Sequence, residues 1–146
     1  MKTFMPKEAE IERKWWVVDA TNIPLGRLAS QVANVLRGKN KPTYSTHMDM
    51  GDYVIIVNSD KVALTGNKLE DKYLRYHTLY PGGDKQIQYK KLMKENSPKA
   101  IEHAVKGMLP KNTLGRKMYR KLFVYAGATH NHQAQNPQPL NVKGGR

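Results

Sequence analysis

The sequence predicts a single α/β domain with a parallel sheet at its centre. Three short apolar runs, near residues 16, 54 and 123, have the composition of buried strands. Stretches with helical spacing of apolar residues lie between these runs, and such alternation is typical of α/β folds. The length of 146 residues suits one domain.

The first strand and helix are expected to form a strand–turn–helix unit. Residues 15–20 are rich in aromatic and β-branched side chains, which predicts a strand, and Pro24 suits the first turn of a following helix. Gly38 predicts the end of that helix. The apolar stripe of the helix consists of Leu25, Leu28, Ala29, Val32, Val35 and Leu36.

The middle of the chain predicts further strands. The continuous apolar run at 53–57 indicates a strand covered on both faces, and residues 62–65 predict a short strand before a turn. Residues 73–79 favour a strand at a sheet edge or in a protruding hairpin, because the sequence Pro81-Gly82-Gly83 breaks the chain after it.

The C-terminal part predicts two helices and a last strand. Ser97 is expected to cap a helix with Pro98 at its first position, and Asn112 to cap a shorter helix that runs to about Lys121. Residues 122–126 predict the final strand. These elements divide the single domain into an N-terminal arm (1–14), an α/β core (15–126) and a C-terminal loop or tail (127–146).

The charge of the chain indicates a polyanionic partner. It holds 25 Lys and Arg against 12 Asp and Glu, for a net charge of +13. Residues 103–146 hold eight basic side chains and no acidic one. Nucleic acid is the first candidate and an anionic membrane surface the second. The sequence has no apolar run long enough for a membrane span and no signal segment, so we expect a cytoplasmic protein without a membrane partner.

Catalytic, cofactor and metal sites are not expected. The chain has no cysteine, no paired carboxylates, no HExxH motif and no serine or threonine beside a poised base. The turn after the first strand has one glycine, Gly26, where a dinucleotide fold needs several. His130 and His132 have no acidic or cysteine neighbour in the sequence to complete a zinc site. We therefore predict no cofactor, no metal and no small-molecule substrate.

The strongest binding candidate is the basic segment 106–121. Arg116 and Arg120 are four residues apart on the predicted helix, where like charges repel, and no acidic residue lies near them in the sequence. This pattern favours an external anion, and a solvated basic face is the alternative interpretation. The predicted RNA-binding residues of the segment are Lys106, Lys111, Asn112, Arg116, Lys117, Arg120 and Lys121.

The other binding candidates are spread along the chain. Lys39 and Lys41 lie in a loop that suits phosphate contact, although complementing a helix dipole is an alternative interpretation. Aromatic and charged residues alternate around Tyr76, which suits base stacking or else an edge strand with one buried aromatic face. These further candidates are Arg27, Arg37, Lys39, Lys41, Lys68, Arg75, Tyr76, His77, His130 and His132.

A series of short motifs runs through nearly the whole chain. They are Arg13-Lys14-Trp15, Leu25-Gly26-Arg27-Leu28, Leu36-Arg37-Gly38-Lys39-Asn40-Lys41, Gly51-Asp52-Tyr53-Val54, Leu64-Thr65-Gly66-Asn67-Lys68, Tyr80-Pro81-Gly82-Gly83, and Val105-Lys106-Gly107-Met108-Leu109-Pro110 followed by Leu114-Gly115-Arg116. In this order the motifs resemble the universal large-subunit family of ribosomal protein L-thirteen, in its bacterial form. Asn131 departs from the family, which has a proline at this place in the C-terminal loop.

The resemblance implies a three-layer α/β/α fold around a four-stranded, largely parallel sheet. It implies a structural constituent of the large ribosomal subunit that binds 23S rRNA, supports early assembly and lies against neighbouring large-subunit ribosomal proteins. It implies no catalytic residue and no cofactor. From the residues alone two alternatives stay open: a nucleotide-dependent enzyme on a Rossmann-like sheet, and a free regulatory protein that binds mRNA through the same surface.

Overall fold

The computed structural model describes residues 5–142, so residues 1–4 of the predicted arm and 143–146 of the predicted tail lie outside the described residues. Its strands are β1 (Trp15–Asp19), β2 (Tyr53–Val57), β3 (Tyr73–His77), β4 (Asp84–Gln88), β5 (Leu122–Val124) and β6 (Gln138–Pro139). Its α-helices are α1 (Leu25–Arg37), α2 (Lys68–Asp71), α3 (Tyr89–Glu95), α4 (Ser97–Met108) and α5 (Thr113–Tyr119). Short 3-10 helices are η1 (Glu8–Glu10), η2 (Ser59–Lys61) and η3 (Gln133–Gln135).

The central sheet of the described chain has the strand order β5-β2-β1-β6, and all neighbouring strands are parallel. Trp15 on β1 lies opposite Tyr53 on β2, and Ile55 on β2 lies opposite Phe123 on β5. This pairing confirms the predicted parallel centre. The fourth strand, β6, is two residues long and comes from the segment that was expected to be a loop.

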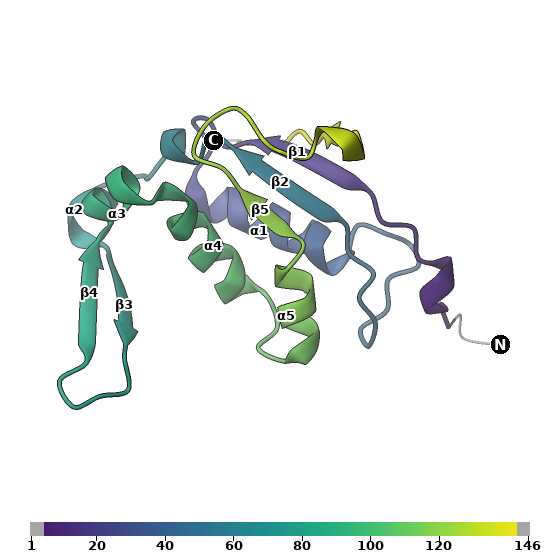
Figure 1. Cartoon of the computed structure of the whole chain (residues 1–146), viewed down its shortest axis with the longest axis horizontal. Coiled ribbons are helices and arrows are strands. Elements are labelled where there is room, and N and C mark those ends of the chain that lie inside the picture. Colours follow the sequence, from purple (N-terminus) through teal and green to yellow (C-terminus); the bar gives the residue numbers. More distant parts are fainter. Residues whose placement is uncertain (1–4, 143–146) are drawn as a thin grey trace.

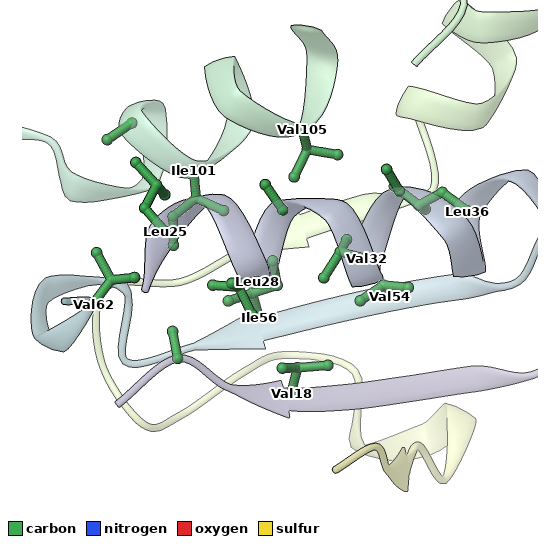
Figure 2. Packing of buried hydrophobic residues seen from close by; sticks show 14 of the residues in the cluster. Val18, Leu25, Leu28, Val32, Leu36, Val54, Ile56, Val62, Ile101 and Val105 are labelled. Carbon is green, nitrogen blue, oxygen red and sulfur yellow. The ribbon is translucent and has the colours of Figure 1, made fainter. Parts of the chain in front are cut away.

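One face of the sheet is covered by α1, and α4 packs on the far side of α1 (Figure 2). Leu28 of α1 lies toward Ile56 of β2 and Val32 lies toward Val54, because residues at helical spacing share one side of the helix. Ile101 of α4 lies above α1 in that view, points toward it and is fully buried. The predicted apolar stripe of α1 is therefore the centre of the hydrophobic core.

The end of α1 also positions the loop that follows it. Gly38 has a φ of 78°, the left-handed conformation that ends many helices, and its N–H donates to the Val35 carbonyl. A Cβ at this position would lie 2.8 Å from the Met50 carbonyl carbon, so no larger residue fits without movement. The loop 39–52 is thereby held against the C-terminal end of the helix.

The opposite face of the sheet is covered by the C-terminal segment. Trp15 stacks on Tyr53 with ring centroids 4.3 Å apart, and the His132 ring lies 5.2 Å from Trp15 and 4.4 Å from Phe123. Residues 127–142, which include η3 and β6, therefore close the side that α1 leaves open. A four-stranded parallel sheet with helices around it agrees with the predicted three-layer α/β/α fold.

A two-stranded antiparallel hairpin, β3–β4, projects from the body of the molecule (Figure 1). This confirms the hairpin alternative for residues 73–79. The prediction of a strand at 62–65 is wrong. Among the described residues, only a single bridge between Ala63 and Pro24 forms there.

The caps of α4 and α5 differ in how well they follow the prediction. Asn96, not Ser97, caps α4 and accepts a bond from the Lys99 N–H at 3.4 Å. The Ser97 hydroxyl is buried and shares a 2.8 Å hydrogen bond with that of Ser59, so it is occupied elsewhere. The predicted cap of α5 is confirmed, because the Asn112 side chain accepts from the Gly115 N–H at 2.8 Å.

Candidate nucleic-acid interface

The predicted binding residues fall into separate groups on the molecule. One group lies on α4, α5 and the turn between them, a second on the β3–β4 hairpin, and a third in the loop after α1. In Figure 1 the hairpin, α5 and this loop all extend toward the lower side of the view, while the C-terminal segment lies along the upper side. The C-terminal segment, which includes His130 and His132 in the sequence, is thus set apart from the other groups.

Five basic side chains form the densest group, which we call the α4–α5 basic surface. It consists of Lys106, Lys111, Arg116, Lys117 and Arg120, all exposed. Within residues 5–142, none of the four ion pairs involves any of them, since the pairs are Lys41–Asp52, Lys90–Glu70, Lys91–Glu95 and Lys121–Asp49. Five cations without an internal counter-ion repel one another, and an external polyanion removes that cost.

A cleft lies between the end of α4 and α5, within this surface. Its cavity volume is about 350 Å³, and its lining includes Lys106, Leu109, Pro110, Lys111, Arg116 and Tyr119. The Lys106 ammonium lies 5.7 Å from the centroid of the Tyr119 ring, so a side chain of α4 reaches across to α5. The cleft combines an apolar floor with a cationic rim.

Lys121 requires a correction, because its ammonium is buried and has partners inside the protein. The residue is only 4% exposed. Its Nζ donates to Asp49 Oδ1 at 2.5 Å, to the Gly51 carbonyl at 2.9 Å and to the Leu36 carbonyl at 3.4 Å. Burial lowers the pKa of Lys121, and the bond to Asp49 opposes that shift. Lys121 therefore fixes the loop after α1 to the core and does not face a surface partner.

Lys41 also has a structural role. Its ammonium lies 2.6 Å from Oδ1 of Asp52, a fully buried carboxylate, and it donates to the Glu12 carbonyl at 2.7 Å. The same carboxylate accepts from the Lys14 N–H and from the Trp16 indole, both at 3.0 Å. Lys41 thus joins the loop to β1 and has less freedom to bind a phosphate than was expected.

The neighbours of Lys41 differ from it in exposure. Lys39 is exposed, as a phosphate contact requires, whereas Arg37 is half-buried and donates to the Tyr44 hydroxyl at 3.4 Å. Arg27 lies exposed in the first turn of α1, and exposed Lys68 donates to the Thr65 hydroxyl at 3.0 Å. The loop after α1 therefore offers mainly Lys39 to a partner.

The hairpin carries its aromatic residues on the outside. Leu79 is 91% and Tyr80 76% exposed at its tip, and Tyr76 on β3 is also exposed. Arg75 and His77 are exposed beside Tyr76. The alternative interpretation, a strand with one buried aromatic face, is wrong, because the side chain that β3 buries is aliphatic Leu74.

His130 and His132 belong to the contact between the C-terminal segment and the sheet. The His132 ring packs against Trp15 and Phe123 in tilted geometry, with interplanar angles of 32° and 50°, and its Nε2 shares a 2.9 Å hydrogen bond with the Tyr125 hydroxyl. His130 Nδ1 accepts from the His132 N–H at 3.2 Å. In the described range, no cluster of three or more His, Cys, Asp or Glu side chains is placed to hold a metal ion. Both rings are half-buried, so they hold the segment in place.

Two acidic residues that the sequence reasoning missed as functional organise this region. Asp49 and Asp52 lie near the end of the loop after α1 and accept the two buried or half-buried lysine ammoniums. The one available signal in the sequence is that two carboxylates flank Gly51. In the structure a Cβ at Gly51 would lie 1.7 Å from the Leu36 carbonyl oxygen.

Between residues 5 and 142, no helix is both long and apolar enough to span a membrane.

Comparison with known proteins agrees with these features. The family model described as Ribosomal protein L13 matches residues 13–131. A curated relative named Large ribosomal subunit protein uL13, from Ruminiclostridium cellulolyticum, is 62% identical over 142 residues, which cover 97% of this chain and 99% of the relative. The relative of the same name from Caldanaerobacter subterraneus subsp. tengcongensis is 60% identical over 143 residues, covering 98% and 100%. The chain therefore belongs to the ribosomal protein L13 family, in its bacterial form.

Proposed function

We propose that this protein is a structural constituent of the large ribosomal subunit that binds 23S rRNA and supports early subunit assembly. Its family and relatives are ribosomal structural proteins, so the chain is not an enzyme, and its place is on the ribosome in the cytoplasm. The relatives carry a name that assigns them to the large subunit. The proposal goes beyond membership of the large subunit in assigning contacts with rRNA and with neighbouring subunit proteins.

The observation that carries the proposal is the α4–α5 basic surface. Lys106, Lys111, Arg116, Lys117 and Arg120 are exposed, and no internal ion pair among residues 5–142 neutralises them. Duplex RNA hides its base edges in a deep, narrow groove, so proteins contact mainly its phosphates, 2′-hydroxyls and shape. Basic side chains held on short, fixed helices suit that form of recognition.

The core makes this surface rigid. Met118 of α5 is buried in the core cluster, and Lys121, directly after the helix, bonds to three groups of the loop 39–52 and α1. A fixed set of cations stabilises the RNA geometry whose phosphates match its spacing. This is how a protein without catalytic groups can favour one folded form of rRNA during assembly.

The hairpin and the loop after α1 supply additional contacts in this proposal. Tyr76 and Tyr80 are exposed aromatics of the kind that stack on unpaired bases, and Arg75 lies beside Tyr76. Lys39 adds one exposed cation in the loop after α1. Lys121 is left out of the interface because it is buried, and Lys41 contributes chiefly to the fold.

The test is the salt dependence of binding to 23S rRNA freed of protein. We expect Arg116→Glu with Arg120→Glu to weaken binding and to lower the slope of log affinity against log salt by about 1 for each lost phosphate contact. The matched control is Lys90→Glu with Lys91→Glu, the same charge change on α3, where both lysines pair with exposed carboxylates. Equal effects of the two double variants would remove α5 from the interface.

A further inference from the structure

We infer that the cleft between α4 and α5 binds a single unstacked nucleotide of rRNA, with the base on its apolar floor and the phosphate on its basic rim. The inference rests on the proposed function and makes it specific. It assigns part of the recognition to one base at a bulge, loop or junction, in addition to the phosphates of a duplex.

The volume of the cleft suits one RNA base and is too small for an RNA duplex. Its cavity of about 350 Å³ is at the lower end of the range for small-ligand pockets. A duplex presents a broad, convex surface and cannot enter a space of this volume. A base that is splayed out of the stack can enter it, and unpaired bases are the parts of RNA that proteins contact most specifically.

The floor of the cleft is apolar and fixed. Leu109 is 4% exposed, Gly115 is buried, and Pro110 and Tyr119 are half-buried. A Cβ at Gly115 would lie 1.7 Å from the Pro110 carbonyl oxygen, which shows how closely the backbone of α5 approaches the turn. A flat base gains by leaving water for such a surface, whereas a bare phosphate does not.

The rim supplies the charge for the phosphate. Lys106, Lys111 and Arg116 surround the opening from α4, the turn and α5, and none of the described residues that line the cleft is acidic. Burial, together with the Glu102 carboxylate, raises the pKa of Tyr119, so its hydroxyl stays protonated and adds no negative charge. Glu102 interacts with the Tyr119 hydroxyl at 3.4 Å and does not itself line the cleft.

Tyr119 is the residue that separates a nucleotide site from a set of phosphate contacts. Stacking on its ring does not depend on counterion release, while the basic rim does. We expect Tyr119→Leu to weaken binding to protein-free 23S rRNA about tenfold. The salt slope should stay unchanged, and Tyr119→Phe, which keeps the ring, should bind like the wild type. Urea midpoints of both variants verify that they fold.

A second measurement uses the wild-type protein and needs no variant. Ultraviolet crosslinking of the complex, read by mass spectrometry of the peptides and by mapping on the RNA, should join one unpaired nucleotide to the segment 106–119. That nucleotide should also lose its base reactivity to chemical probes when the protein binds. Crosslinks that lie only outside this segment would overturn the inference even if Tyr119→Leu fails to fold.

The outcomes separate this inference from the proposed function. If Tyr119→Leu binds with wild-type affinity while Arg116→Glu with Arg120→Glu loses affinity and slope, the cleft holds no base and the interface remains. If wild-type protein does not bind 23S rRNA at low salt, the proposed function itself fails. A tenfold loss in both Tyr119→Leu and Tyr119→Phe would also overturn the inference, because the hydroxyl, not the ring, would then be responsible.

Discussion

At the scale of single residues, two lysines that lie close together in the sequence have opposite roles. Lys117 and Lys121 are four residues apart and are separated by only one helical turn in the predicted helix. The structure ends α5 at Tyr119, so Lys121 turns inward to the carboxylate of Asp49 while Lys117 stays exposed. A lysine next to a strand is not always a surface charge, and its burial depends on partners far away in the sequence.

Removing the Lys121 ammonium should therefore destabilise the fold. We expect Lys121→Met to lower the free energy of unfolding by about 3 kcal/mol, because it leaves the Asp49 carboxylate and two carbonyls without their donor. Urea denaturation followed by circular dichroism measures this loss. Lys117→Met, the exposed control, should change the free energy by no more than about 0.5 kcal/mol. Similar losses in both variants would contradict the structural role of Lys121.

The same residues show which parts of the site could be predicted. The exposed cations of α4 and α5 follow from a basic run with no acidic residue near it in the sequence. The buried pairs Lys121–Asp49 and Lys41–Asp52 do not follow, because 72 residues separate the members of the first pair and only the fold brings them together. His132 was predicted at a binding surface, and the structure packs it on the sheet.

At the scale of elements, the sequence predicted those whose pattern is set by burial. The strands β1, β2 and β5 lie in apolar runs, and the stripes of α1 and α4 repeat at helical spacing. Strand β4 (Asp84–Gln88) carries one apolar residue, so its pairing with β3 decides its structure. Strand β6 has two residues and forms only because the C-terminal segment returns beside β1.

The turn between α4 and α5 provides a prediction at this scale. Gly115→Ala should destabilise the protein by about 2 kcal/mol, because the new Cβ would meet the Pro110 carbonyl at 1.7 Å and force the two helices apart. Gly107→Ala is the matched control in α4, with nothing within 4 Å of the added carbon, and should stabilise the helix by about 0.5 kcal/mol. Chemical denaturation compares the two, and a neutral Gly115→Ala would mean that this close approach is absent.

At the scale of the whole molecule, some segments enclose the core and other segments carry exposed charge. The sheet, α1 and α4 enclose the core, and the C-terminal segment closes the second face through its aromatic contacts. The whole chain has a net charge of +13. Such an excess of one sign destabilises a free protein by self-repulsion, and a bound polyanion removes that repulsion. Stability and binding should therefore respond to salt in opposite directions.

This opposition is a prediction about the intact chain. Raising NaCl from about 0.1 M to about 1 M shortens the screening distance from about 10 Å to about 3 Å, so the melting temperature of the free protein should rise while its affinity for 23S rRNA falls. Arg116→Gln with Arg120→Gln removes two of the unpaired cations of the α4–α5 basic surface. This variant should melt at a higher temperature than the wild type at low salt, gain less from added salt and bind rRNA more weakly. Differential scanning calorimetry and filter binding in the same buffers measure both responses. A variant that both melts lower and binds more weakly at low salt would show that these arginines stabilise the fold, and that the positive surface is not maintained at the expense of stability.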